Sequence, residues 1–471
     1  MITKIIKYYV VVLLLSLIFP VIADARLDYT VFPRLSIEGR YSDNYYNREI
    51  EKDDALIATI SPGILLSVMT QNILLDLDYS LNAAGYFIRD EENRYEYYNQ
   101  RGFANFRANL SRNISVLLRD EIIKNLDTLL IDENLTRQER MAQYIMNTAG
   151  GELIYRYAEG SEIGAGYSFT LVEYLDSNID DSERHNFTGR ISRSFNIRNI
   201  GNINYRHSIV DYRRVGGAGQ VSREDIYEDE IRGRFTHFFT PRFSGGLNYG
   251  YIETHYDGAT VDYHIHDATL ESVYNITPYL TADGRFGMYF REQYNRENKW
   301  EEGLVYRAGL TYTYPTFTGS AAYEGGYNSV YTNPQMLEFF RYWRVAGEAM
   351  YHLIREKLTL RGRGYYTVNN YPNSLNNRED HVWNAGGGID YQILNWLLFA
   401  LEYGHTVRNS NLPGFHYTEN IYIARITISY RISTMERDIE TRERRERERR
   451  IETGVERREM ERREREEDNA R

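Results

Sequence analysis

Strict alternation of apolar and polar residues is the feature that most constrains what this chain can fold into. Between residues 73 and 82, one set of positions carries Ile73, Leu75, Leu77, Tyr79 and Leu81, and the other carries Asp76, Asp78, Ser80 and Asn82. Successive side chains of a β-strand point to opposite faces, so a period of two predicts a strand with one dry face and one wet face.

The same alternation returns along most of the sequence. It is clear in residues 163–171, 304–313, 358–366 and 422–431, and it runs from about Val31 to Ile432. A chain of 471 residues could hold about three soluble domains of roughly 150 residues each. A single texture over this length instead predicts one large all-β domain.

The connections between the predicted strands alternate in length. Short ones with turn-forming residues occur at 70–72, 112–113, 160–161, 240–242, 277–278 and 395–396. Longer polar ones lie between them, at 42–54, 88–96, 176–184, 293–300 and 371–378. This pattern is typical of a transmembrane antiparallel up-and-down β-barrel with periplasmic turns and extracellular loops.

Counting hairpins predicts about 20 strands, within a range of 18–22, and an even number. A barrel of this width is not filled by its own side chains, so we expect an aqueous lumen that loops narrow. A β-sandwich would rarely keep one texture for about 400 residues. A propeller would show a blade repeat, and none is visible.

Composition agrees with a secreted membrane barrel. Residues 1–25 are predicted to be a signal peptide, with Lys4 and Lys7, an apolar stretch up to Phe19 and the cleavage motif 23–25. The chain has no Cys and 43 Tyr, and tyrosine suits a membrane interface. Its mean hydropathy of -0.57 argues against helical spans but not against a barrel, in which only alternate residues face lipid.

Three regions are therefore expected: the signal peptide at 1–25, the barrel at 26–432 and a tail at 433–471. Few residues precede the first strand, which predicts a barrel without an N-terminal plug. The tail holds 13 Arg and 14 Asp or Glu, with pairs such as Glu440 and Arg444 at the i,i+4 spacing that favours a helix. It is either a periplasmic spacer or docking helix, or a solvated charged segment without a specific partner.

Charged residues on the wet face are the candidates for function. Their position predicts that they line the lumen, where rings of charge tune which solutes pass. Arginine binds carboxylates and phosphates well, which suits a path for anionic or hydroxylated polymers; alternatively, these groups only pair across strands and keep the lumen wet. The main candidates are Arg206, Arg232, Arg234, Arg285, Arg307, Arg344, Glu348, Arg361, Arg363 and Arg425.

No motif predicts catalysis, a cofactor or a metal. His255, His264 and His266 surround one predicted loop, but this spacing alone is a weak metal signal. His207 and Ser208 are adjacent and should point to opposite faces of their strand, so they do not form a nucleophile and base. We expect no enzyme, no cofactor and no bound metal. An acidic chain whose basic tail is matched by Glu also lacks the charge pattern of a nucleic-acid binder.

The start of the predicted barrel resembles the beta-barrel porin-2 type of outer-membrane proteins, including those associated with exopolysaccharide and exosortase systems. Residues 42–46 (SDNYY), 60–63 (ISPG) and 76–79 (DLDY) carry the resemblance, and the strand layout extends it to about Ile432. The tail departs from the usual pattern, in which the chain ends at the final aromatic strand.

The resemblance implies a pore in the outer membrane of a Gram-negative-type bacterium, with a role in exporting surface or capsular polysaccharide. The expected partners are outer-membrane lipid and lipopolysaccharide, the barrel-assembly machinery and components of polysaccharide export. The alternative is a structural or adhesive barrel whose loops bind partners and whose lumen conducts little.

Overall fold

The computed structural model describes ten segments of the chain, and all statements about structure refer to them. They are residues 28–88, 95–125, 143–175, 181–213, 224–258, 261–294, 300–329, 339–355, 357–372 and 377–433. The predicted signal peptide and almost all of the predicted tail lie outside these residues. Within them, no helix is long and apolar enough to span a membrane, a finding that has no bearing on crossing by strands.

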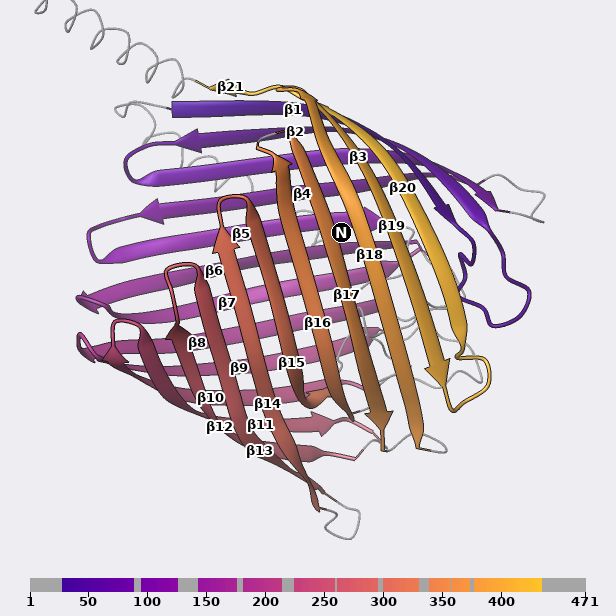
Figure 1. Ribbon diagram of the computed structural model, residues 1–471. Coiled ribbons are helices and arrows are strands. Elements are labelled where there is room, and N and C mark those ends of the chain that lie inside the picture. Colours follow the sequence, from indigo (N-terminus) through magenta and orange to yellow (C-terminus); the bar gives the residue numbers. More distant parts are fainter. Residues whose placement is uncertain are drawn as a thin grey trace, which may run out of the picture.

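The described residues form long strands that follow one another along the chain (Figure 1). Their bounds are β1 Asp28–Ser42, β2 Ala55–Met69, β3 Ile73–Ile88, β4 Tyr95–Asn109, β5 Ile114–Asn125, β6 Tyr144–Ala158, β7 Ser161–Tyr174, β8 Asp181–Asn196, β9 Asn199–Arg213, β10 Ile226–Thr240, β11 Phe243–Tyr256, β12 Tyr263–Asn275, β13 Leu280–Gln293, β14 Trp300–Tyr314, β15 Phe317–Ser329, β16 Phe339–Ile354, β17 Leu358–Tyr371, β18 Arg378–Leu394, β19 Leu397–Ser410, β20 Tyr417–Ser429 and β21 Ile432–Ser433.

Each strand pairs antiparallel with the strand before it and the strand after it, and the ring closes between β1 and β20. The short strand β21 continues β20 and pairs with the first part of β1, opposite Thr30 and Val31. The protein is therefore a closed antiparallel up-and-down barrel of 20 strands, as the hairpin count predicts. In Figure 1 the strands of the two walls cross obliquely, which is the tilt that closure of a barrel requires.

The period-two pattern divides the wall into an outer face and an inner face. On β3, Leu77 and Tyr79 are 39% and 46% exposed on the outer face, whereas Asp76 and Asp78 lie on the inner face, where they accept hydrogen bonds from other inward side chains. Large apolar residues are exposed in this way on strand after strand. In water such a surface would be unfavourable, so the outer face requires a lipid environment.

Connection lengths separate the two ends of the barrel. At the turn end, where β1 begins and β20 ends, each connection holds two to four residues. At the opposite loop end, each connection holds at least six. The predicted alternation of turns and loops is confirmed.

Pro62 explains one interruption of the ladder. Strand β2 pairs with β3 from Ala55 to Ile60 and again from Gly63 to Met69, but Ser61 and Pro62 have no partner on β3. Proline has no N–H to donate, so it is tolerated in a barrel wall only where one hydrogen bond is missing. Its neighbours on β1 remain in register.

Aromatic residues on the outer face gather near both ends of the barrel. Near the loop end, tyrosine hydroxyls bond histidine rings on the next strand: Tyr167 and His185 are 2.8 Å apart, and Tyr249 and His266 are 2.7 Å apart. Near the turn end lie Phe195, Phe243 and other aromatics. Phe195 follows His185 by ten positions, which is about 33 Å along the strand. Because the strands tilt by about 40° from the barrel axis, this is a height of about 25 Å along the axis.

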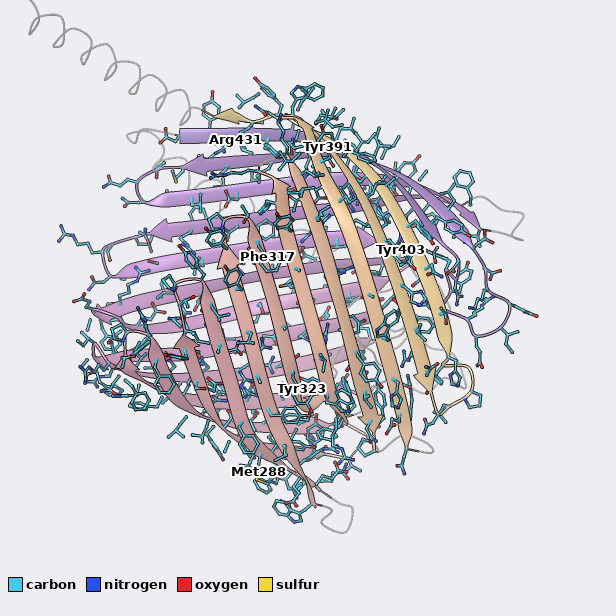
Figure 2. The ribbon with its side chains drawn as sticks, viewed as in Figure 1. Met288, Phe317, Tyr323, Tyr391, Tyr403 and Arg431 are labelled. Atoms are coloured by element: carbon cyan, nitrogen blue, oxygen red, sulfur yellow. The ribbon has the colours of Figure 1, made fainter. Side chains whose placement is uncertain are left out.

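That height matches the apolar band of an outer-membrane barrel, whose two edges carry aromatic girdles. Figure 2 shows the labelled side chains of Tyr323 and Tyr403 on the wall facing the viewer. Both are more than two-fifths exposed on the outer face, and a ring with an apolar body and a polar tip suits a membrane interface.

A pair of neighbouring substitutions tests which face meets lipid. Leu310 is 50% exposed on the outer face of β14, and Thr311 is exposed on the inner face. We expect Leu310→Arg to lower the free energy of unfolding by about 2 kcal/mol, because it places a charge in the hydrocarbon layer. Urea titration of the barrel folded in vesicles measures it. Thr311→Arg is the control, and equal losses for the two variants would contradict the assignment of faces.

Candidate functional site: the charged lumen

All ten predicted lumen residues lie on the inner face. The register shows this for Arg232 and Arg234 on β10, because the intervening positions Ile231 and Phe235 are exposed on the outer face. Arg285 and Arg307 are direct cross-strand neighbours on β13 and β14. The remaining candidates follow by the same alternation on their own strands.

Along β9 to β15 the inward charges form a ladder of ion pairs. Arg206 on β9 contacts Glu228 and Glu230 on β10 at 2.7 and 2.6 Å. Glu230 also pairs with Arg232, which reaches Asp267 on β12 at 3.2 Å. Arginine and carboxylate therefore alternate around this part of the wall, and each neutralises the other.

Further ion pairs lie closer to the turn end of the same strands. Glu271 on β12 accepts from both Arg234 and Arg285, at 2.7 and 3.1 Å. Arg307 on β14 lies between Asp283 and Glu324, at 2.8 and 2.6 Å. Five of the ten predicted residues thus belong to three groups in which arginine and carboxylate alternate.

Three more predicted residues have partners on the other wall. Arg361 on β17 contacts Asp390 on β18 at 2.8 Å and Glu402 on β19 at 3.1 Å. The Arg425 guanidinium donates to Glu38 on β1 at 2.7 Å, across the closing seam. Arg344 lies over the ring of Tyr365, at 4.3 Å from its centroid.

The last two predicted residues have a different environment. Glu348 on β16 accepts a hydrogen bond from Ser320 at 3.1 Å, and it lies directly opposite Arg363 in the register of β16 and β17. Within the described residues, Arg363 has no ion pair and no hydrogen bond, and its side chain is exposed to the lumen.

Glycines allow several of these pairs to span an intervening strand. Arg34 on β1 reaches Asp78 on β3 through two contacts of 2.8 and 2.6 Å. The strand between them presents Gly63, and a Cβ there would lie 2.9 Å from Arg34 Nε. We call such a position a glycine window.

The same device recurs around the barrel. Gly164 lies beneath the pair of Arg190 and Glu152, and a Cβ on it would be 2.7 Å and 2.8 Å from their polar atoms. Gly250 similarly underlies the contact of Arg232 with Asp267. Strands that share no backbone hydrogen bonds are thereby joined through their side chains.

Near the loop end, the inner face of β17 to β20 becomes dry. Asp380 is fully buried and Arg408 is 2% exposed, and the two form an ion pair together with Arg378. The guanidinium of Arg378 stacks on Phe415 at 3.9 Å, so the 411–416 connection covers this cluster. Because Phe415 shields the cluster from water, removal of one charged partner would leave an uncompensated buried charge.

Two apolar clusters lie on the inner face near the loop end. Tyr45, from the connection after β1, packs on inward residues of β2 and β3 that include Ile57 and Tyr86. On the far side, Ile265 and Tyr289 are buried with Phe339, from β16. The Tyr327 hydroxyl donates to Asp267 at 2.7 Å, spanning from β15 to β12. Tyr45 therefore brings one connection over the inner face, whereas the second cluster consists of strand residues, and the narrowing of the lumen by loops stays a prediction.

Sequence reasoning missed several inward residues. Arg34, Glu38 and Arg40 share one face of β1, in the same alternation that identified the other candidates, and could have been found by it. Arg378 and Arg408 could not, because their burial depends on how a connection folds over them. The glycine windows were also missed, since they appear only once the register of three strands is known.

The histidines near one predicted loop have separate partners. His255 pairs with Asp262 at 2.5 Å, His264 with Glu292 at 3.1 Å, and His266 with Tyr249. Among the described residues, no group of three His, Cys, Asp or Glu side chains is arranged to hold a metal ion. His207 contacts Asp229 at 2.9 Å, whereas Ser208 is buried on the inner face opposite Glu228.

Comparison with solved structures finds the same fold. A variant of the FrpB iron transporter from Neisseria meningitidis has a TM-score of 0.50 at 10% identity, over 86% of this chain and 81% of that chain. A mutant ferric enterobactin receptor from Pseudomonas aeruginosa, in complex with enterobactin, also has a TM-score of 0.50, at 8% identity over 85% and 81%. OccK7 of Pseudomonas aeruginosa gives 0.41 at 14% identity, over 88% and 100%.

At these identities the likeness concerns the fold, which is that of outer-membrane β-barrels. No protein-family model matches the sequence, and no curated protein is similar to it. The resemblance to the beta-barrel porin-2 type therefore stays a prediction.

A double-mutant cycle tests the glycine windows. Gly63→Val should displace Arg34 from Asp78, and Asp78→Asn removes the charge from the same pair. We expect each single variant to lose about 1 kcal/mol of unfolding free energy, and the double variant to lose little more than one of them. The measurement is urea titration in vesicles.

Gly39→Val supplies the control for this cycle, because a Cβ at Gly39 meets no atom within 4 Å. Its effect should add to that of Asp78→Asn. Full additivity for Gly63→Val as well would show that the window is not needed for the pair.

Proposed function

We propose that the protein is an outer-membrane pore with a water-filled lumen, and that it serves the export of a surface or capsular polysaccharide. The main observation in favour of a pore is that the inward arginine side chains are exposed to solvent although they form ion pairs. The side chains of Arg206, Arg234, Arg285 and Arg307 are 40–48% exposed although each one has a carboxylate partner. Pairing runs along the wall rather than across the lumen, which leaves space for water.

Barrel width supports the same conclusion. Barrels of about eight strands are filled by their own side chains, whereas those of 16–18 strands leave an aqueous channel. A ring of 20 strands is wider still. We expect the loop end, where apolar clusters lie near Tyr45 and Phe339, to be the narrowest part and to set the size of what passes.

The chemistry of the wall favours a hydroxylated chain as cargo. Arginine and carboxylate alternate over short distances and are interspersed with Asn, Ser and Thr side chains such as Asn248, Thr269 and Ser320. Sugar hydroxyls can donate to carboxylates and accept from guanidinium groups in turn. Together with the resemblance at residues 42–46 and 60–63, this supports polysaccharide export. The proposal includes lipopolysaccharide and the barrel-assembly machinery as partners, and gives the chain no catalytic role.

A structural or adhesive barrel remains the second candidate. The apolar cluster of Ile265, Tyr289 and Phe339 and the dry cluster at Asp380 both occupy the loop end of the lumen. If these closed the lumen completely, the loops would be the functional surface. Conductance separates the two candidates.

Planar-bilayer recording provides the first test. Folded protein inserted from detergent should give discrete conductance steps, because paired wall charges keep a continuous water column. Selectivity between potassium and chloride should be weak, since most inward arginines are matched by carboxylates. Protein that is folded by circular dichroism but gives no steps would leave only the structural reading.

A genetic test addresses the cargo. Deletion of the gene from its host should abolish polysaccharide on the cell surface while polymer accumulates in the periplasm, and the wild-type gene should restore export. An unchanged amount of surface polysaccharide in the deletion strain would contradict polysaccharide export but not the pore.

A further inference from the structure

A groove runs along the inner face between the ion-pair ladder of one wall and the closing seam. It has a volume of about 440 Å³ and extends from β15 to β1. This is within the range of pockets that hold small organic ligands. Its lining includes Arg40, Arg361, Arg363, Glu348 and Glu402.

Three glycines make the floor of this groove. Gly386 and Gly388 lie on the inner face of β18, and Gly404 lies beside Gly386 on β19. The missing side chains leave a depression in the wall, while Arg361 and Arg363 on the adjacent strand β17 project above it. At Gly404, where a Cβ would meet no atom within 4 Å, a ligand can approach the backbone closely, whereas Gly388 lies under the pair of Arg361 and Glu402.

The charge of the groove also differs from that of the ladder. Arg361 is neutralised by Asp390 and Glu402. Arg40 and Arg363 have no ion pair or hydrogen bond among the described residues, and Arg40 Nε is shielded from solvent without a partner. Two guanidinium groups thus remain available to an anion that enters the groove.

Neutral polar groups complete the lining. The Asn384 amide donates to the Thr406 hydroxyl at 2.8 Å, which leaves the Asn384 carbonyl oxygen and the Thr406 proton able to bond hydroxyl groups. Glu348, opposite Arg363, can accept from another hydroxyl. Guanidinium, amide, hydroxyl and carboxylate groups around a bare backbone floor fit a sugar ring that bears one negative charge.

We propose that this groove binds acidic sugar residues of a chain, with Arg363 on β17 and Arg40 on β1 each holding the carboxylate of a separate residue, because β18, β19 and β20 lie between the two arginines. The inference rests on the proposed function and names its substrate class: a polysaccharide that contains uronic acid. A carboxylate is favoured over a phosphate monoester because Glu348 and Glu402 also line the groove, and they would repel a doubly charged group more strongly. Arginine binds carboxylates in a bidentate geometry, which adds orientation to attraction.

Single-channel recording with a soluble probe tests the groove. Trigalacturonate should interrupt the current through wild-type channels in a concentration-dependent way, and maltotriose, a neutral sugar of similar size, should do so much more weakly. We expect Arg363→Gln and Arg40→Gln each to weaken trigalacturonate binding about tenfold, since each removes one charge-assisted contact. Basal conductance should persist in both variants.

Arg119→Gln is the matched control. Arg119 is an exposed arginine on the inner face of β5 that likewise has no ion pair among the described residues, but it lies outside the groove. Its loss should leave trigalacturonate binding unchanged. A tenfold loss here as well would show that general lumen charge, and not the groove, attracts the probe.

A steric variant tests the groove by another route. A Cβ at Gly404 meets no atom within 4 Å, so Gly404→Gln should fold while its side chain fills the floor. Trigalacturonate interruptions should then become shorter and rarer without loss of conductance. Unchanged interruptions would place the probe elsewhere in the lumen and overturn the inference.

Other outcomes distinguish failure of the groove proposal from failure of the proposed pore function. Absence of conductance in folded wild-type protein would contradict the pore. Conductance with identical trigalacturonate binding in wild type, Arg40→Gln and Arg363→Gln would overturn the groove alone. Stronger interruption by glucose 6-phosphate than by glucuronate at equal concentration, abolished by Arg363→Gln, would reassign the groove to phosphate and contradict the carboxylate.

Discussion

Closure of the backbone hydrogen-bond ring is the constraint on which the rest of this structure depends. In a lipid layer, an unpaired N–H or C=O costs several kcal/mol, so a spanning sheet must have no free edge. The first and last strands meet this requirement, with nine residue pairs between β1 and β20 and two more between β1 and β21. Once the ring is closed, the period of two decides the rest: one side chain of each neighbouring pair faces lipid and the other faces the lumen.

Much of the fold could be predicted from the sequence because it is encoded locally. The alternation in β3, the turn at 70–72 and the polar connection at 42–54 each depend on neighbouring residues only. Strand count and topology followed from adding such signals. The sequence also placed residues such as Arg232 and Arg307 on the wet face, because parity along a strand is a local property.

The pairing of the wet face could not be predicted, since it depends on register between distant strands. Arg34 and Asp78 are 44 residues apart, and their contact requires two correct registers and a glycine between them. The dry cluster around Asp380 was missed for a related reason: a connection folds over it, and connection geometry is not written in a periodic pattern. The groove could not be predicted, because glycines in a strand pattern indicate a weakened strand and not a binding surface.

The two walls of the lumen differ in how they treat charge. From β9 to β15 the arginines and carboxylates neutralise each other in three alternating groups, so that this wall is hydrated but attracts neither anions nor cations strongly. From β16 to β1 glycines hollow the wall, and among the described residues Arg40 and Arg363 have no carboxylate partner. A solute moving through the lumen would therefore meet one wall on which charges are balanced and one wall that can bind it.

The glycine windows add a mechanical consequence. Backbone hydrogen bonds join only adjacent strands, but the pair of Arg34 with Asp78 joins β1 to β3, and the pair of Arg190 with Glu152 joins β8 to β6. Ion pairs of this kind oppose the sliding of one strand along the next. At these two places, sliding of the strands would break an ion pair in addition to the backbone hydrogen bonds.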